Sequence, residues 1–296
     1  MRLRPLETVN LAALALLLVV TLATWRALAD PGEILLRFAL MGAFLAVVVF
    51  LAQRAERLPK ALHIAVDFYP AAFIPFVYES LGPLIAAARG SARDDLLIAV
   101  DRAILGGDVT VLLQPLVTPF WGAFFYLAYS TYYFLPIVLG AFLWSRDTAA
   151  ARRFIFTLSI CFYVSYLGYF TVPAYGPRTA LADRHTVTLE TTAVARAISH
   201  TIDELEHTKL DAFPSGHTMI ATAVLIVAWR RMRRLFWLLL PPAAMLIVST
   251  IYCRYHYLVD ILAGIVLAFA TVPVADRLYD HVTAEELGTP DYSSRS

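Results

Sequence analysis

The chain has 296 residues, of which 59% are hydrophobic and 16% charged, and its mean hydropathy is +0.66. A soluble globular domain carries less apolar and more charged sequence, so most of this chain is expected to lie in lipid. The net charge is only +1 and the basic residues stand in short clusters, which excludes an extended nucleic-acid-binding surface.

Long apolar stretches predict the transmembrane segments, because a helix needs roughly 20 mostly apolar residues to cross a bilayer. Eight such stretches lie at residues 9–29, 34–53, 62–88, 120–144, 153–175, 214–230, 235–253 and 256–276. They are longer than the alternating strands of a membrane β-barrel. We therefore predict an all-α polytopic helix bundle with about eight spans.

The chain is predicted to form one unit. Its first apolar run lacks an obvious small-residue cleavage site and is as long as a full span, so we expect a retained helix rather than a signal peptide. No internal repeat or low-complexity tract divides the chain after this helix. We predict a single integral membrane domain over residues 1–280 and a polar C-terminal tail over 281–296.

Basic clusters predict the orientation in the membrane. When the eight spans alternate in direction, four clusters fall on the same side: Arg2 and Arg4; Arg54, Arg57 and Lys60; Arg146, Arg152 and Arg153; Arg230, Arg231, Arg233 and Arg234. Short loops rich in Lys and Arg stay in the cytoplasm, so this side and both termini are predicted to be cytoplasmic. The high alanine and arginine content favours a bacterial inner membrane, with the other loops on the periplasmic or exoplasmic side.

Polar side chains gather at helix ends on that outer side. His256 and Asp260 are four residues apart and share one face of a predicted helix. A carboxylate in this position holds the imidazole in one tautomer and leaves its other nitrogen free to attack. The pair predicts a nucleophile and its orienting group.

A second cluster opens the sixth predicted span. His217 lies in the first helical turn, directly after Ser215 and Gly216, where backbone N–H groups and the helix dipole favour an anion. Arg178 and Arg254 add the bidentate guanidinium contacts that phosphate oxygens prefer. This combination predicts a phosphate site.

Together these residues predict phosphoryl transfer. In this interpretation His256 attacks phosphorus, Asp260 orients it, and His217 protonates the departing oxygen. Arg178, Arg254 and the helix-end amides stabilise the phosphate oxygens. No metal ion or other cofactor is required. The two cysteines, at positions 161 and 253, show no metal-ligand spacing.

The pairing of Pro214-Ser215-Gly216-His217 with His256-x-x-x-Asp260 resembles the type 2 phosphatidic acid phosphatase superfamily. The resemblance covers roughly residues 95–275 and implies that family's six-helix core in the C-terminal part of a membrane-embedded catalytic domain. It also implies a phosphohistidine at His256, His217 as general acid and base, and a site that faces away from the cytoplasm.

Other positions depart from the usual phosphatase pattern and resemble the inositol phosphorylceramide synthase branch. Thr171, Thr179 and Thr250 stand where the phosphatases have Lys, Pro and Arg. The motifs Ala-Phe-Pro-Ser-x-His at 212–217 and His-Tyr-x-Val-Asp at 256–260 are similar to the synthase forms. So is Asp-Arg-x-x-Leu-Gly at 101–106, which is similar to a segment ahead of the core in that branch.

Three functions stay open from these motifs. A headgroup transferase would use a phospholipid donor and a lipid acceptor such as ceramide, whereas a lipid phosphatase would use water. Gly216 and Thr218, on either side of His217, follow the phosphatase form of that motif. A non-catalytic lipid-binding protein is the third reading, and the intact His217, His256 and Asp260 count against it.

Charged residues away from these motifs have two interpretations each. Asp67 and Glu79 lie inside the third predicted span, where a charge costs on the order of 2.5–3.5 kcal/mol. Either they line a polar path or pair with a basic group, or they are protonated or hydrogen-bonded in a structural role, and we favour the structural interpretation. Asp101 and Arg102 form an interfacial ion pair or belong to the rim of the site.

Aromatic and loop residues near the motifs are also ambiguous. The tyrosines at 126, 129, 132 and 133 line a headgroup pocket or, as is more common, serve packing. Apolar residues at helical spacing between 188 and 208 predict an amphipathic helix. It lies passively on the bundle or covers the site as a lid, and we favour the passive helix. His185, His200 and His207 are predicted to be solvated.

Overall fold

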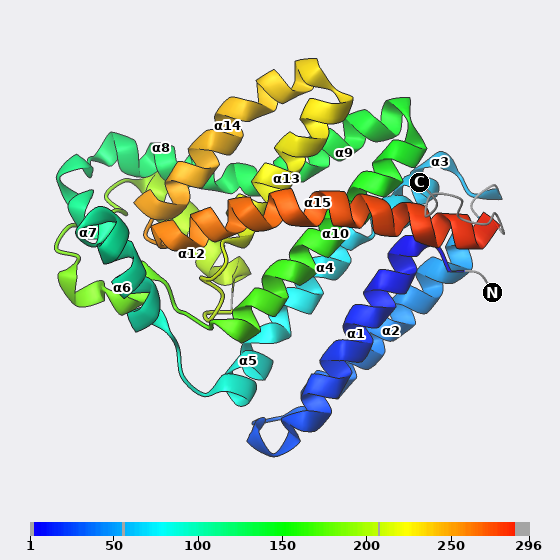
Figure 1. Ribbon diagram of the computed structural model, residues 1–296, viewed down its shortest axis with the longest axis horizontal. Coiled ribbons are helices and arrows are strands. Elements are labelled where there is room, and N and C mark those ends of the chain that lie inside the picture. The colour runs from blue at the N-terminus through cyan, green and yellow to red at the C-terminus, as the bar shows by residue number, and fades with distance from the viewer. Residues whose placement is uncertain (1–2, 55–56, 207, 288–296) are drawn as a thin grey trace, which may run out of the picture.

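The computed structural model describes residues 3–54, 57–206 and 208–287, and within these ranges the chain is helical, with no strand (Figure 1). The predicted all-α fold is confirmed. The helices are α1 (Pro5–Ala23), α2 (Pro31–Ala52), α3 (Lys60–Phe68), α4 (Pro70–Glu79), α5 (Leu81–Arg89), α6 (Asp94–Leu105), α7 (Val109–Leu112), α8 (Pro119–Ser130), α9 (Leu135–Arg146), α10 (Thr148–Thr171), α11 (Pro177–Ala180), α12 (Ala193–Leu205), α13 (Gly216–Arg231), α14 (Arg233–Tyr252) and α15 (Leu258–Leu287).

Seven helical segments within the described ranges are long and apolar enough to cross a membrane. They are α1, α2, α3 to α5, α8 to α9, α10, α14 and α15, and they match seven of the eight predicted spans. The remaining prediction, 214–230, corresponds to α13, whose 16 residues rise about 24 Å and fall short of a 30 Å hydrocarbon core. The protein is an integral membrane protein in which α13 lies inside the bundle, packed by α10, α14 and α15.

Two of the predicted spans are broken helices. The segment 62–88 divides at Pro70 and again near Ser80, and the segment 120–144 divides at a 3₁₀ turn, Thr131–Tyr133, ahead of Pro136. Proline lacks an amide hydrogen, so the helical ladder is interrupted where Pro70 and Pro136 stand in the first turn of new helices. Both prolines line the same apolar cavity inside the bundle.

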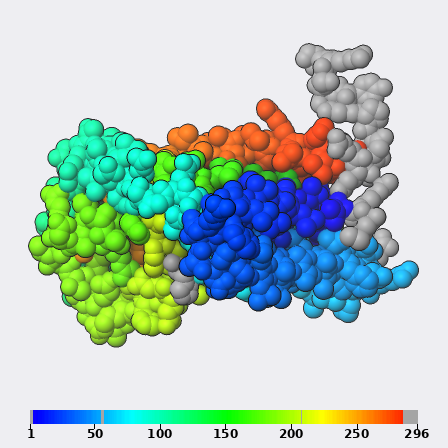
Figure 2. Space-filling view, turned by 90° about the horizontal axis from the view of Figure 1, so that it is seen from below, coloured from blue at the N-terminus to red at the C-terminus, as the bar shows by residue number. Residues whose placement is uncertain are grey.

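The α1–α2 hairpin lies on the outside of the bundle, where α1 packs along α10, α15 and α5 (Figures 1 and 2). Its outward positions are apolar and exposed, as lipid contact requires. They include Leu16, Leu18, Val19, Leu22, Leu36, Leu40, Val47 and Phe50.

Asp67 is buried and satisfied by basic partners. Its carboxylate accepts from Arg4 at 2.8 Å and from Arg152 at 3.0 and 3.1 Å, and Trp144 Nε1 donates at 3.2 Å. This pairing with basic groups is the alternative that we did not favour for Asp67, and it ties α1, α3, α9 and α10 together. Glu79, the other acidic residue of that predicted span, is half-buried at the end of α4.

Members of the basic clusters predicted to share one side gather at one end of the bundle, and Arg2 lies outside the described residues. Arg4 and Arg152 meet at Asp67, while Arg153 and Arg230 both bind Asp276 of α15 at 2.8 and 3.1 Å. Asp276 lies 16 residues beyond Asp260, or about 24 Å along α15. The basic end and the end that carries the histidines are therefore on opposite sides of the bundle.

Glycine allows the two motif-bearing helices to approach closely. A side chain at Gly264 of α15 would place its Cβ 2.7 Å from the carbonyl oxygen of Ser215, at the start of α13. Beyond this crossing α15 continues to Leu287, so the first residues of the predicted polar tail are helical. The rest of that tail, 288–296, lies outside the described residues.

Candidate active site

The starts of α13 and α15 bring the two motif histidines together. The ring centroids of His217 and His256 are 5.8 Å apart. The amide of Ser215 also donates to the carbonyl oxygen of Asp260 at 3.0 Å, which joins the two motifs through the backbone. The two motif histidines and Asp260, which the sequence placed in one site, thus lie close together.

His256 is held through one ring nitrogen. Its Nδ1 lies 2.8 Å from the carbonyl oxygen of Ala212 and 3.4 Å from Oδ2 of Asp260. A carbonyl oxygen only accepts, so Nδ1 carries the proton and the neutral ring keeps its lone pair on Nε2. The predicted contact with Asp260 is confirmed, but the nearer partner is a backbone oxygen that the sequence did not reveal.

The surroundings of His256 favour its charged form. Burial by itself would lower the pKa of this imidazole, but the hydrogen bond and charge of Asp260, with Asp211 and the Ala212 carbonyl, raise it above the usual value. Oδ2 of Asp260 also accepts from the amide of Tyr257 at 2.8 Å. The carboxylate is therefore fixed in place while it faces the ring.

His217 lies in the first turn of α13. Its Nε2 is 3.4 Å from Oε1 of Glu206, and the rings of Tyr129 and Tyr132 pack on its imidazole at centroid distances of 4.6 and 4.2 Å. Ser215 caps this helix, because its Oγ accepts from the amide of Thr218 at 3.3 Å. Glu206 was not singled out from the sequence, because it stands in a loop-connected segment with no motif spacing.

The two helix N-termini differ in their free amides. At α15, the amides of Tyr257, Leu258 and Val259 donate to the carboxylates of Asp260 and Asp101. At α13, the amides of Gly216 and His217 have no acceptor among the residues that the structure describes. An anion would therefore find open donors at α13.

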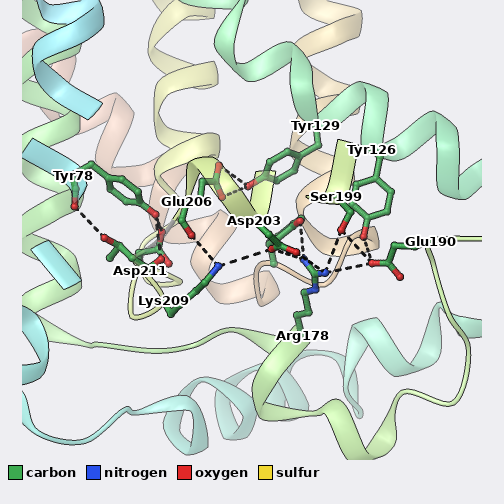
Figure 3. Close-up of polar contacts among 12 residues, drawn as sticks. Tyr78, Tyr126, Tyr129, Arg178, Glu190, Ser199, Asp203, Glu206, Lys209 and Asp211 are labelled. Atoms are coloured by element: carbon green, nitrogen blue, oxygen red, sulfur yellow. Dashed lines mark hydrogen bonds and ion pairs between the residues drawn. The ribbon is translucent and has the colours of Figure 1, made fainter. Parts of the chain in front are cut away.

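Arg178 does not present a free guanidinium. Its two terminal nitrogens donate to Asp203 at 3.0 and 3.1 Å, to Ser199 at 3.2 Å and to Glu190 at 3.4 Å (Figure 3). The hydroxyl of Tyr255 accepts a further bond at 3.0 Å. Arg178 was predicted to bind a phosphate, but in this structure its guanidinium already binds carboxylates, which an anion would have to displace.

Arg254 is buried and adopts a left-handed backbone conformation, with φ of 66°. Its guanidinium donates to the carbonyl oxygen of Val187 at 2.7 Å, and burial lowers its pKa below the usual value. In this arrangement Arg254 fastens the loop ahead of α12.

Asp101 and Arg102 have separate partners, so the ion pair between them, one of the two open alternatives, is wrong. Asp101 accepts from the amides of Leu258 and Val259 at 2.8 and 2.9 Å and caps α15 directly after His256. Arg102 instead binds Asp108 at 2.7 and 3.0 Å. The side chain of Asp101 therefore supports the site from α6.

The predicted amphipathic helix is α12, which buries Ala195, Ser199 and Ile202 against the bundle near α8. His200 is exposed as predicted, whereas His207 lies outside the described residues. The prediction for His185 is wrong. Its ring is half-buried 3.0 Å from Oγ1 of Thr110, and burial with the charge of Arg254 lowers its pKa to about 4.

An apolar cavity of about 290 Å³ opens at His217 and Gly216. Tyr132 and Tyr133 lie at its polar end with Glu206 and Asp211, so one pair of the tyrosines lines a pocket as well as packing. Along α10 the cavity is lined from Tyr169 to Phe154, a rise of about 22 Å. Its other walls are Phe68, Pro70, Ala71, Ile74, Pro75, Tyr78, Pro136, Ile137, Ile155, Leu158, Ser159, Phe162, Tyr166 and Leu205.

Asp211 marks the polar end of this cavity. One oxygen accepts from the hydroxyl of Tyr78 at 2.5 Å (Figure 3). Burial raises the pKa of this carboxyl to about 6 and Glu206 adds to the effect, although the Tyr78 bond acts in the opposite direction. In the described part of the chain, no three His, Cys, Asp or Glu side chains are arranged to hold a metal ion.

Comparison with known proteins identifies the family. A model of the PAP2 superfamily matches residues 95–274, which is more than half of the chain and includes α6 and both histidine motifs. No curated protein and no solved structure matches the chain. Membership indicates a phosphatase or phosphotransferase that acts on lipid-like substrates. The chain, with its helical core in the C-terminal part, belongs to the PAP2 superfamily.

Proposed function

We propose that the protein is a membrane lipid phosphotransferase that works through a phosphohistidine-type intermediate on His256. In the first step Nε2 of His256 attacks phosphorus while the bond to the departing lipid oxygen breaks, and His217 gives that oxygen a proton. In the second step an acceptor hydroxyl loses its proton to His217 and attacks phosphorus, and the bond to Nε2 breaks. Asp260 and the Ala212 carbonyl hold His256 throughout.

The observation that carries the proposal is the cavity that ends at His217. Its long part is apolar and its site end is polar, as a lipid with a hydrocarbon chain and a phosphate head requires. The free amides of Gly216 and His217 would hold the phosphate oxygens there. Arg178 and Arg254 would join them only if the contacts to Asp203, Glu190 and Val187 open.

Filling the cavity should weaken the binding of long-chain substrates. A tryptophan at Leu158 would exclude about two to three methylenes, each worth about 0.8 kcal/mol, so KM for a long-chain lipid phosphate should rise about 10- to 50-fold. A short-chain soluble phosphate ester should keep its KM. The matched control is Leu167→Trp, at a half-exposed position of the same helix outside the cavity. Equal effects of both variants on both substrates would argue against a chain-binding role.

The choice between lipid transferase and phosphatase depends on the acceptor. Gly216 resembles the phosphatase motif, but packing alone explains a glycine here, because a Cβ would lie 2.6 Å from the hydroxyl of Tyr169. This position therefore does not distinguish a phosphatase from a transferase. We favour the transferase because the motif at 256–260 is synthase-like, with water as the alternative acceptor. The donor would be a phospholipid with a phospho-alcohol headgroup, and the acceptor a lipid alcohol such as ceramide or diacylglycerol.

Product analysis decides this point. The purified protein would be incubated in detergent with a mixed phospholipid extract, with and without ceramide or diacylglycerol, and the products followed by mass spectrometry. A new headgroup-bearing lipid that requires the acceptor would establish the transferase. Free phosphate and dephosphorylated lipid, independent of acceptor, would establish the phosphatase.

We also propose that the histidine end faces the periplasm or cell exterior and that the basic end is cytoplasmic. The gathering of basic clusters at the end opposite His256 supports this orientation. In right-side-out cells, an impermeant maleimide should label a cysteine at the exposed Ser91 but not one at the exposed Asp280. The reverse pattern would invert the assignment.

A further inference from the structure

His217 differs from His256 in how its motif is built. Asp260 accompanies His256 one helical turn later, but position 221, one turn after His217, is alanine. A distant segment supplies the carboxylate instead. Glu206, directly after α12, places Oε1 3.4 Å from Nε2 of His217.

Glu206 is held in this position by tyrosines of the α8–α9 segment. The hydroxyl of Tyr133 donates to its carboxylate at 3.0 Å. The hydroxyl of Tyr129 donates to the same carboxylate at 3.2 Å (Figure 3). Burial by itself would raise the pKa of Glu206, but the contact with His217 and these hydroxyls lower it below the usual value. The carboxylate that faces the imidazole is therefore ionised and fixed.

The imidazole of His217 is equally confined. Tyr129 and Tyr132 pack on its ring, and only 12% of the side chain is exposed. Nε2 makes no hydrogen bond within the described residues, but the ionised carboxylate 3.4 Å away can only accept, so it favours the proton on that nitrogen. The proton that moves during the reaction would then sit on Nδ1.

We infer that Glu206 is a positioning residue for His217, which fixes its tautomer and stabilises its imidazolium form so that Nδ1 exchanges a proton with the lipid oxygen. The inference rests on the proposed function and extends it. The two histidines then form mirror-image pairs. His256 is hydrogen-bonded at Nδ1 and reacts at Nε2, whereas His217 faces a carboxylate at Nε2 and reacts at Nδ1.

The test compares two leaving groups in a single turnover. A lipid alkoxide needs a proton to depart, whereas nitrophenolate departs without one. General acid catalysis contributes roughly 10²–10⁴-fold. Glu206→Gln should therefore slow the release of the lipid alcohol about 10- to 100-fold and the release of nitrophenolate from p-nitrophenyl phosphate less than about threefold. Glu204→Gln, at an exposed site paired with His200 on α12, is the matched control and should change neither rate.

Several outcomes would overturn the inference. Equal loss with both leaving groups would assign Glu206 to structure alone. A lower KM without a change in rate would mean that Glu206 only occupies the phosphate position. Unchanged kinetics in both Glu206→Gln and Glu204→Gln would mean that Glu206 does not position His217. By contrast, a wild-type protein that releases neither product, or whose release survives His256→Ala, would defeat the proposed function.

A measurement that does not depend on turnover distinguishes failure of this inference from failure of the proposed function. In histidine-labelled protein, ¹⁵N shifts identify which ring nitrogen of His217 carries the proton, with His217→Ala giving the assignment. Wild type should show the proton on Nε2, and Glu206→Gln should show a mixture of tautomers. The same tautomer in both proteins would contradict the inference whatever the activity. Tyr133→Phe, which removes one of the two hydroxyls, should give an intermediate result.

Discussion

Replacing His256 with alanine is expected to lower lipid turnover by at least about a thousandfold, because the variant lacks the nitrogen that forms the bond to phosphorus. The ring of His256 makes one hydrogen bond, to the Ala212 carbonyl, and an ion-pair contact with Asp260. Its removal leaves the backbone bonds at the start of α15 in place. We therefore expect a folded, inactive protein.

The measurement pairs turnover with thermal unfolding in detergent. His200→Ala is the matched control, because this histidine is exposed on α12 and lies outside the site. It should retain both activity and stability. Activity of His256→Ala within tenfold of wild type would rule out the phosphohistidine assignment, and loss of the folded state would require the isosteric His256→Gln instead.

The motif residues were predictable because helical spacing is local. His256 and Asp260 meet four residues apart on one helix, and Ser215 caps the helix that carries His217. The apolar runs likewise predicted the spans, since length and hydropathy decide membrane insertion. The prolines at 70 and 136 indicated the helix breaks, but the long apolar runs around them led us to predict unbroken spans.

The partners of these residues could not be predicted, because they come from distant segments. Glu206 reaches His217 through the fold of the α12 segment, and the Ala212 carbonyl reaches His256 through a backbone atom that no side-chain pattern records. Arg178 had the right residue type for a phosphate, yet Asp203 and Glu190 take up its donors. The role of such a residue can be assigned only when the fold shows which distant side chains lie beside it.

Asp101 shows how a residue outside the motifs supports the reaction. Its carboxylate joins α6 to the first amides of α15, two positions after His256. Asp94, earlier on α6, accepts from the amides of Tyr175 and Gly176 and from the hydroxyl of Tyr257. The helix α6 therefore holds both the Tyr175-Gly176 segment and the start of α15.

Asp101→Ala should therefore lower both the stability of the protein and its kcat. Each hydrogen bond to a charged group is worth about 1.5–3 kcal/mol, so losing both should cost about 2–4 kcal/mol after water replaces part of the cap. Because α15 then begins less firmly beside His256, kcat should fall about tenfold or more, while KM changes little. Asp101→Asn, which keeps one acceptor oxygen, should lie between, and the exposed Asp95 of the same helix provides the control Asp95→Ala. Lower stability with an unchanged kcat would mean that the start of α15 does not control the position of His256, and the site would then be held by the Ala212 and Asp260 contacts alone.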